Sequence, residues 1–305
     1  MSIKKKSISL LLIISLFSIL ISGCSSKQVN SVNISKETTK TATNVTGELK
    51  VSYINVGQAD SILIQQGSQN MLIDAGNNGD ANTVIDYLKS QGVKKLDYVI
   101  GTHPHEDHIG SMDKVINTFD IGAIYMPKET STTKTFKDVV SAIKAKNLKV
   151  TAPVPGSSFN LGQAKCDILA PNGSDYKDVN NASIVLKVTF GEKKFLFEGD
   201  AEDVSEKEMI TKGYDLSADV LKVGHHGSSS SSTPEFLDKV KPTYAVISCG
   251  IANDYGHPHV ETMDKLKKKN IKVFRTDEDG TIVITTDGKT IKSSAKEGSY
   301  SGMHK

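Results

Sequence analysis

The sequence lacks an excess of charge of either sign. Its 37 lysine and arginine residues nearly balance its 35 aspartate and glutamate residues, which gives a formal net charge of +2 over 305 residues. Nucleic-acid-binding proteins usually carry a basic excess on one face. The near balance therefore counts against tight, passive binding of DNA. It does not count against an enzyme that holds phosphate through metal ions.

Cysteine is scarce as well. The three cysteines are Cys24, Cys166 and Cys249, and no two of them have C-x-x-C spacing. This pattern excludes a zinc ribbon or a dithiol redox motif. Cys166 and Cys249 lie in apolar, strand-like stretches, so we expect them to be small buried hydrophobic residues.

The first 24 residues predict an export signal. Three lysines at positions 4–6 precede a mostly apolar segment at 7–21, which is too short for a transmembrane helix. The segment ends in Leu-Ile-Ser-Gly-Cys, which resembles a bacterial lipobox and implies that Cys24 is the lipidated residue. The alternative is an ordinary cleavable signal followed by an incidental cysteine.

The composition changes twice after the signal. Residues 25–46 are mainly Ser, Thr, Asn and Lys, and such a segment cannot bury enough surface to fold, so we predict a flexible tether. Residues 47–295 have the strand and helix patterns of one folded domain, and residues 296–305 form a polar tail. These boundaries predict an extracytoplasmic protein anchored to the bacterial cell membrane by lipid, with no protein partner predicted.

The folded part alternates predicted strands with helices. Residues 49–56 largely alternate apolar and polar side chains, as a strand does, and a helix is expected at 81–90. Every histidine except His304 lies in a loop after a predicted strand, and Asp74 and Asp200 lie at or just past strand ends. Because functional sites of open α/β folds form at such ends, we expect these residues to converge.

The densest polar cluster follows an apolar strand at 96–100. His103, His105, Asp107 and His108 form the motif H-x-H-x-D-H. Two histidines two residues apart can bind one ion, and an aspartate beside a histidine can bind a second ion nearby. This composition is typical of a two-metal hydrolytic site, and the alternative is a solvated, histidine-rich loop.

The motif resembles that of the metallo-β-lactamase superfamily over residues 49–293. The resemblance implies an α/β (α+β) fold, the four-layer αββα sandwich, and two divalent metal ions, zinc or manganese. It also implies that Asp74 organises the ligands from the second shell and that Asp200 bridges both ions. A turn aspartate is the alternative for Asp200 taken alone. His225, or else His226, supplies the last ligand.

One histidine that the superfamily usually has is missing. No histidine lies between His108 and His225, and the matching stretch is Asn-Asn-Ala-Ser at 180–183. This departure counts against an ordinary β-lactamase or lactonase. It leaves coordination positions on the first ion, which His103 and His105 would bind, open to water or Asn181. We therefore expect the second ion, bound by Asp107, His108, Asp200 and one histidine of the 225–226 pair, to be held more tightly.

Four further motifs narrow the resemblance. They are Val-Gly-Gln-Ala-Asp at 56–60, Gly-Asp-Ala-Glu at 199–202, Lys-Val-Gly-His-His-Gly-Ser at 222–228, and Tyr-Gly-His-Pro at 255–258. Together they are similar to the hydrolase domain of competence proteins of the ComEC type and its free-standing relatives. Asn55 and Ala59 depart from that family, which usually has Asp and Gly there, and neither is an obvious ligand.

The resemblance implies roles for the remaining polar residues. We expect His225 to bind metal and His226 to donate a hydrogen bond to phosphate, while Asp107 also orients the attacking hydroxide. His257 is expected to donate to phosphate or to protonate the leaving oxygen, with a plain loop histidine as the alternative. Ser228 is expected to bind phosphate, unless residues 228–232 are only a polar loop.

Three functions are consistent with these residues. The first is an extracytoplasmic phosphodiesterase or nuclease that uses a hydroxide held by two metal ions, with DNA as a candidate substrate. The second is an esterase of surface polymers that releases phosphorylcholine from teichoic acids. The third is a non-catalytic surface lipoprotein that keeps the fold for binding.

Overall fold

The computed structural model describes residues 45–303. The described residues belong to one compact unit. The export signal, Cys24 and nearly all of the predicted tether lie outside the described residues. Among residues 45–303, no helix is long and apolar enough to cross a lipid bilayer.

The first of two sheets contains the first and last strands of the unit. Its eight strands lie in the order β15-β14-β1-β2-β3-β4-β5-β6. They are β1 Leu49–Tyr53, β2 Ile62–Gln66, β3 Gln69–Ile73, β4 Lys95–Ile100, β5 Asp120–Tyr125, β6 Val150–Thr151, β14 Ile282–Thr286 and β15 Ile291–Ser293. β1 pairs antiparallel with β14, so the end of the chain closes onto its beginning. β3, β4 and β5 run parallel.

The second sheet comes from the middle of the chain. Its seven strands lie in the order β13-β12-β11-β10-β9-β8-β7. They are β7 Ser158–Leu161, β8 Ala164–Ala170, β9 Val185–Phe190, β10 Lys193–Phe197, β11 Val220–Lys222, β12 Tyr244–Ile247 and β13 Lys272–Arg275. β10 to β13 run parallel, as β3 to β5 do in the first sheet. Each sheet therefore has a parallel part joined to an antiparallel part.

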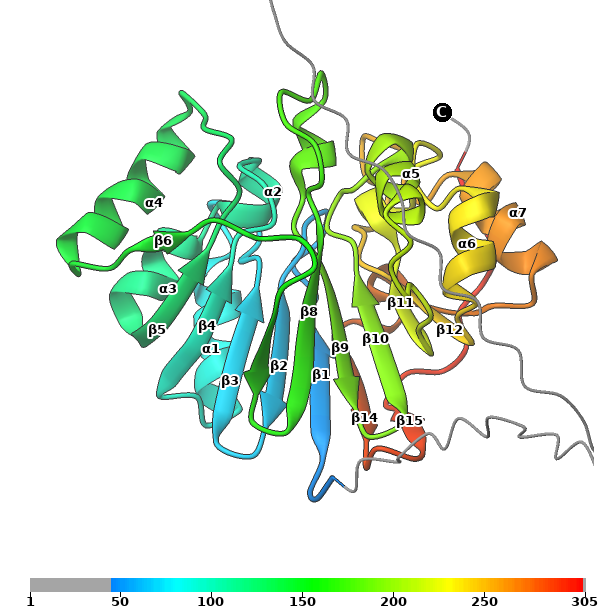
Figure 1. The fold of residues 1–305 in the computed structure, drawn as a ribbon, viewed down its shortest axis with the longest axis horizontal. Coiled ribbons are helices and arrows are strands. Elements are labelled where there is room, and N and C mark those ends of the chain that lie inside the picture. The colour runs from blue at the N-terminus through cyan, green and yellow to red at the C-terminus, as the bar shows by residue number, and fades with distance from the viewer. Residues whose placement is uncertain (1–44, 304–305) are drawn as a thin grey trace, which may run out of the picture. The chain divides into compact units, whose positions relative to one another are not determined.

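Helices cover the outer face of each sheet (Figure 1). The helices are α1 Ala81–Ser90, α2 Glu106–Ile109, α3 Met112–Thr118, α4 Lys134–Ala145, α5 Asp203–Thr211, α6 Pro234–Val240, α7 Val260–Lys268 and α8 Thr276–Asp279, with short 3₁₀ turns η1 Val179–Ala182 and η2 Gly224–Gly227. The apolar residues of α1, α3 and α4 pack on the first sheet, and those of α5, α6 and α7 pack on the second.

The strand residues alternate between two cores because successive side chains of a strand point to opposite faces. In β10, Phe195 and Phe197 pack between the two sheets, whereas Leu196 packs under the helices of the second sheet. Burying each phenylalanine ring removes apolar surface from water, which stabilises the fold by about 1.5–3 kcal/mol. The layers are thus helix, sheet, sheet and helix, which confirms the predicted αββα sandwich.

The C-terminal segment differs from the predicted polar tail at 296–305. The Gly298 amide donates to the Val273 carbonyl (2.7 Å), and the Met303 amide donates to the Pro258 carbonyl (2.9 Å). The folded body therefore continues to Met303, because these backbone groups find partners on β13 and on the loop before α7.

Candidate metal centre

The histidine motif lies in the turn and the short helix that follow β4. His103 and His108 are buried, Asp107 is partly exposed, and α2 carries Asp107 and His108. A Cβ placed on Gly110 would lie 2.2 Å from the carbonyl carbon of Asn77. Only glycine permits this approach, so α2 packs directly against the loop that follows β3.

Asp74 lies on that loop and orients His108. Its Oδ1 accepts the Thr102 backbone N–H (2.8 Å), and its Oδ2 accepts the Thr102 hydroxyl (2.7 Å). His108 Nδ1 lies 2.9 Å from the same Oδ2. Because a carboxylate only accepts hydrogen bonds, Nδ1 carries the proton and Nε2 of His108 is left to face the site.

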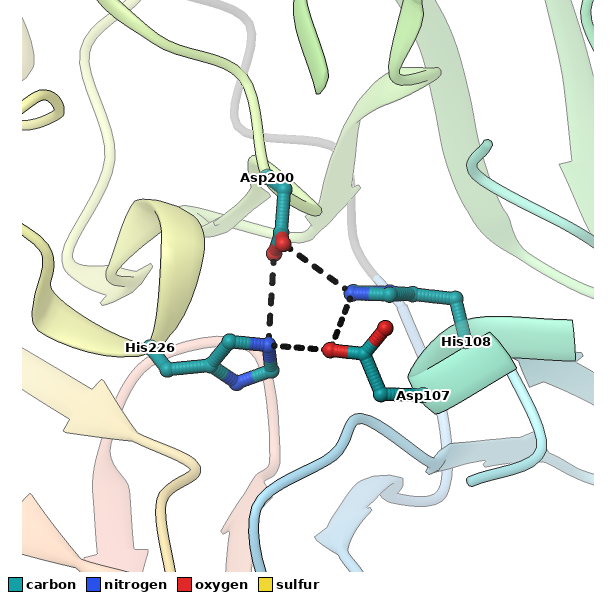
Figure 2. Close-up of side chains that lie close together, drawn as sticks. All are labelled: Asp107, His108, Asp200 and His226. Atoms are coloured by element: carbon teal, nitrogen blue, oxygen red, sulfur yellow. Dashed lines mark hydrogen bonds and ion pairs between the residues drawn. The ribbon is translucent and has the colours of Figure 1, made fainter. Parts of the chain in front are cut away.

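Four side chains from three separate segments converge beside His108. Figure 2 shows Asp107 and His108 from α2, Asp200 from the loop after β10, and His226 from η2. His108 Nε2 lies 3.1 Å from Asp200 Oδ2, and His226 Nε2 lies 3.2 Å from Asp107 Oδ2. One ligand atom from each residue lies within 4.8 Å of all the others, which is close enough for one ion to contact all four. Two imidazoles and two carboxylates form a ligand set that suits zinc, manganese or iron.

The hydrogen bonds around this cluster fit metal binding. His226 Nδ1 lies 2.9 Å from the Ser248 carbonyl, which can only accept, so Nε2 of His226 is free of its proton in the neutral ring. Metal-binding histidines commonly donate their other ring N–H to a carbonyl or carboxylate in this way. Within residues 45–303, the buried His108 Nε2 and Asp200 Oδ1 have no hydrogen-bond partner. A bound cation would satisfy both atoms.

The charges in the cluster stabilise one another. Burial alone raises the pKa of Asp200, but the His108 and His226 imidazoles lower it well below its ordinary value. The pKa of Asp107 is lowered in the same way, against the effect of burial, mainly by His108. Both carboxylates are therefore ionised and ready to bind a cation.

A second group of donors lies on the other side of Asp200. His103 Nε2 is 2.9 Å from His105 Nδ1 and 3.9 Å from Asp200 Oδ2. His225 Nε2 lies 3.7 Å from the same Asp200 oxygen. The Oδ2 atom of Asp200 therefore lies near both groups, as a ligand shared by two ions would.

The structure brings His226, and not the predicted His225, into the four-residue cluster. Both residues have left-handed backbone conformations, with φ of 48° and 53°. The two rings are turned 64° to each other with centroids 6.2 Å apart, so neighbouring residues face different parts of the site. The correction follows from this strained turn, which cannot be seen in the order of the residues.

The structure also corrects the role expected for Asn181. Its Oδ1 accepts the backbone N–H groups of Glu202 (3.2 Å) and Ser205 (3.0 Å), and its Nδ2 donates to Glu202 Oε2 (3.3 Å). All these contacts lie within the protein, and Asn181 is buried. Glu202 Oε1 in turn accepts from His225 Nδ1 (3.1 Å). Asn181 therefore positions Glu202, which orients His225.

A buried ion pair behind the site has no role in the sequence-based prediction. Lys222, which is fully buried, donates to Asp60 Oδ2 (2.7 Å), and Asp60 Oδ1 lies 3.8 Å from His226 Nδ1. Burial alone lowers the pKa of Lys222, but the nearby carboxylates, Asp60 first, raise it above its ordinary value. Both residues lie in motifs that carry the family resemblance. Because 162 residues separate them in the sequence, the motifs did not show that the two side chains form a pair.

Two cavities adjoin each other, and the smaller of them opens over the metal cluster. The smaller, about 290 Å³, is lined by the cluster residues Asp107, Asp200 and His226 together with His105 and His257. The larger, about 690 Å³, contains Ser228 at its wall. The predicted residues His105, Asp107, Asp200, His225, His226 and His257 therefore line one cavity, whereas Ser228 lines only the larger one.

Comparison with known proteins decides the family. The model of the metallo-beta-lactamase superfamily matches residues 54–251. The chain belongs to this superfamily. The matched segment contains the histidine motif, Asp200 and His226, so this metallo-β-lactamase domain is a hydrolase of the superfamily with a candidate site for divalent metal ions.

Several curated proteins are similar to this metallo-β-lactamase domain over most of its length. ComE operon protein 3 of Bacillus subtilis is 30% identical over 256 residues, which cover 78% of this chain and 33% of that protein. Competence protein ComA of Neisseria gonorrhoeae is 29% identical over 237 residues, which cover 77% of this chain and 32% of that protein. The predicted resemblance to competence proteins is confirmed. The chain spans about a third of the length of these relatives.

Solved structures agree on the fold. YhfI of Bacillus subtilis, a metallo-beta-lactamase fold protein, is 14% identical and superposes with a TM-score of 0.51 over 81% of this chain and 100% of that chain. A mutant of the beta-hydroxylase CmlA gives a TM-score of 0.52 at 15% identity, over 80% of this chain and 54% of that chain. At these identities the likeness shows the shared fold alone.

Proposed function

We propose that this chain is a metal-dependent phosphodiesterase that works outside the cytoplasmic membrane. The observation that carries the proposal is the cluster of Asp107, His108, Asp200 and His226 at the floor of a cavity. The names of the similar proteins, a competence protein and a recombination protein among them, support nucleic acid as the substrate.

The chain offers two adjacent positions for zinc or manganese. The four-residue cluster would hold the tighter ion, and His103, His105 and Asp200 would hold the other, with His225 at its edge. Bound divalent ions lower the pKa of water and neutralise charge on phosphoryl oxygens. Asp74 keeps His108 in the ligand orientation, and Glu202 does the same for His225.

His257 is placed to donate a hydrogen bond to the leaving oxygen. Its ring centroid lies 5.3 Å from that of His225 and 6.1 Å from that of His226, at the wall of the cavity above the cluster. Burial first, and then the neighbouring imidazoles, lower the pKa of His257 to about 3, so the ring is neutral at ordinary pH. A neutral imidazole can donate a hydrogen bond from its one N–H to the leaving oxygen and stabilise the negative charge that develops there.

The lipobox-like sequence before Cys24 supports a lipid anchor on the outer side of the bacterial cell membrane. This location would bring the enzyme into contact with incoming DNA or with cell-surface polymers. A second candidate function, release of phosphorylcholine from teichoic acids, is supported by the near-balanced charge of the chain, which does not favour tight binding of DNA.

The test is a metal analysis combined with a cleavage panel. The full-length chain, loaded with zinc or manganese, would be assayed on plasmid DNA, nitrophenyl phosphodiesters and choline-containing cell walls. We expect phosphodiester cleavage that Asp200→Ala abolishes and that the surface control Asp238→Asn keeps, since Asp238 contacts only Lys269.

Failure to cleave any phosphodiester with either ion would contradict the proposed activity. Release of choline phosphate without cleavage of DNA would decide for the polymer esterase. Less than one tightly bound ion per chain, together with no effect of His108→Ala, would favour a non-catalytic lipoprotein.

A further inference from the structure

The larger cavity adjoins the metal cavity directly. His225, Tyr255 and His257 line both of them. A phosphodiester bound over the metal cluster would therefore have room to extend one of its two ester groups past these three rings into the larger cavity. Its volume of about 690 Å³ admits a group of nucleoside size.

Tyr255 presents an exposed aromatic face at the junction. The residue is 67% exposed, and its ring stacks on that of His257 with centroids 5.8 Å apart and planes 20° apart. The loop below is held in place, since Asn253 Oδ1 accepts the His257 amide (3.0 Å) and His259 Nε2 lies 3.1 Å from the Tyr255 carbonyl. An aromatic ring on such a rigid loop is a preorganised stacking platform.

The rest of the lining carries no free cation for phosphate. Of residues 45–303, no lysine or arginine lines either cavity. The Glu202 carboxylate accepts from Ser230 Oγ (2.7 Å) as well as from Asn181 and His225, so both of its oxygens already have donors from the protein. The remaining polar groups of the interior are serine hydroxyls, an asparagine and histidines, which suit an uncharged group with hydrogen-bonding edges.

This lining argues against two other occupants. Further phosphates of a long polyanion would need lysine or arginine contacts, which the described lining lacks. A quaternary ammonium group prefers a cage of several aromatic faces, and Tyr255 is the single phenylalanine, tyrosine or tryptophan among the described residues that line the cavity. Asp178 and Asp254 are exposed at the rim, where charges are well solvated and attract weakly.

We propose that the larger cavity binds the nucleoside attached to the scissile phosphate, with its base stacked on Tyr255. The inference rests on the proposed phosphodiesterase function and names its substrate class as nucleotide esters recognised one nucleoside at a time. Base stacking on an aromatic side chain tolerates any sequence, because every base has a π face.

The test compares three esters with one common leaving group. The p-nitrophenyl esters of thymidine 5′-phosphate, methyl phosphate and phosphorylcholine differ only in the group that stays on phosphorus. In the full-length, metal-loaded chain, Tyr255→Ala should lower the ratio of kcat/KM for the thymidine ester to that for the methyl ester about 5- to 100-fold. Tyr255→Phe should keep this ratio, because it keeps the ring.

Ile251→Ala is the matched control. Ile251 is 80% exposed on the same loop and does not line the cavity, so the ratio should stay unchanged. An unchanged ratio in Tyr255→Ala would overturn the inference. A fall confined to the choline ester would overturn it too, in favour of a cation pocket.

A binding measurement separates this inference from the proposed activity. Saturation-transfer NMR with thymidine, which has no phosphate, needs neither metal nor turnover. We expect a signal in the wild-type chain that Tyr255→Ala removes. If none of the esters is cleaved but this signal is found, the proposed activity is wrong and the nucleoside site is still supported. If the wild-type chain gives no signal, the nucleoside site is refuted.

Discussion

Gln58 fixes the position of the proton on His257. Gln58 Nε2 lies 3.2 Å from His257 Nδ1, and Gln58 Oε1 accepts the Gly250 backbone N–H at 3.1 Å. The backbone donor decides which end of the amide is the oxygen, so the amide nitrogen must donate to His257 Nδ1. The proton of the neutral ring is therefore on Nε2, where it can be donated in a hydrogen bond to the leaving oxygen.

Changing Gln58 should alter the His257 tautomer. Gln58→Glu replaces the donor with an acceptor, which moves the proton to Nδ1, whereas Gln58→Ala removes the contact. We expect kcat/KM on a phosphodiester to fall roughly 100-fold for Gln58→Glu and roughly tenfold for Gln58→Ala. Nitrogen-15 NMR of the histidine rings would report the tautomer directly.

The control for this pair is Gln65→Ala. Gln65 also donates from its amide, to Asn70 Oδ1 at 2.9 Å, but it lies on β2 away from the cavities. Its removal should leave the His257 signals and the activity unchanged. An Nε2-protonated His257 in Gln58→Glu would show that the amide does not set the tautomer.

His226 and His225 should differ in their effect on metal binding. Since His226 belongs to the four-residue cluster, His226→Ala should weaken binding of the tighter ion by more than about 100-fold, because losing only an outer hydrogen-bond partner costs 10- to 100-fold. His225→Ala should leave this ion in place and affect the weaker one. Equilibrium dialysis with metal analysis measures both; the reverse order would restore His225 as the ligand of the tighter ion.

The buried pair of Lys222 and Asp60 should be costly to break and cheaper to replace. Lys222→Met leaves the Asp60 carboxylate buried without its cation, so the free energy of unfolding should fall by about 3–5 kcal/mol. The double variant Lys222→Met with Asp60→Leu should recover most of this loss. Urea denaturation measures each change.

An exposed pair gives the matched comparison. Lys134 contacts Asp138 at the surface of α4, with its side chain 88% exposed, so Lys134→Met should change the free energy of unfolding by about 0.5 kcal/mol or less. If Lys222→Met were equally mild, the buried pair would have no part in holding the site.

Asp215 should make stability depend on pH in the acid range. Burial raises its pKa, but the Ser217 hydroxyl and the ammonium groups of Lys187 and Lys194 together lower it below the ordinary 3.8. Each ammonium nitrogen lies 3.0 Å from Asp215 Oδ2. A lowered folded-state pKa adds stability that is complete above the unfolded pKa and is lost as pH falls below it. Asp215→Asn should therefore destabilise the chain at pH 7 more than at pH 3.

Urea midpoints of both proteins at pH 7, 5 and 3 would measure this difference. Asp175→Asn is a suitable control, because Asp175 is exposed and contacts only the neighbouring Ser174. Its effect should be small at every pH. An Asp215→Asn deficit as large at pH 3 as at pH 7 would show that the ion pairs add nothing to stability.

The fold could be predicted from the sequence because the residue patterns that specify its strands and helices are local. The period-two alternation of Leu49–Tyr53, the turn between β2 and β3, and the amphipathic segment that became α1 each depend on neighbours within a few residues. The histidine motif has the same property, since His103 to His108 occupy a single turn. Resemblance to a known superfamily then supplied Asp74 and Asp200 as partners.

The sequence by itself thus determined the αββα sandwich and predicted a candidate metal-binding cluster, most of whose members the structure brings together. Only the tertiary structure decided that His226 rather than His225 completes the cluster, that Asn181 supports Glu202, and that Gln58 and Lys222 lie against the site. The physical reason is that these outcomes depend on backbone torsion at one strained turn and on contacts between residues up to 199 positions apart. Neither the torsion of a single turn nor a long-range contact produces a repeating pattern of residues in the sequence.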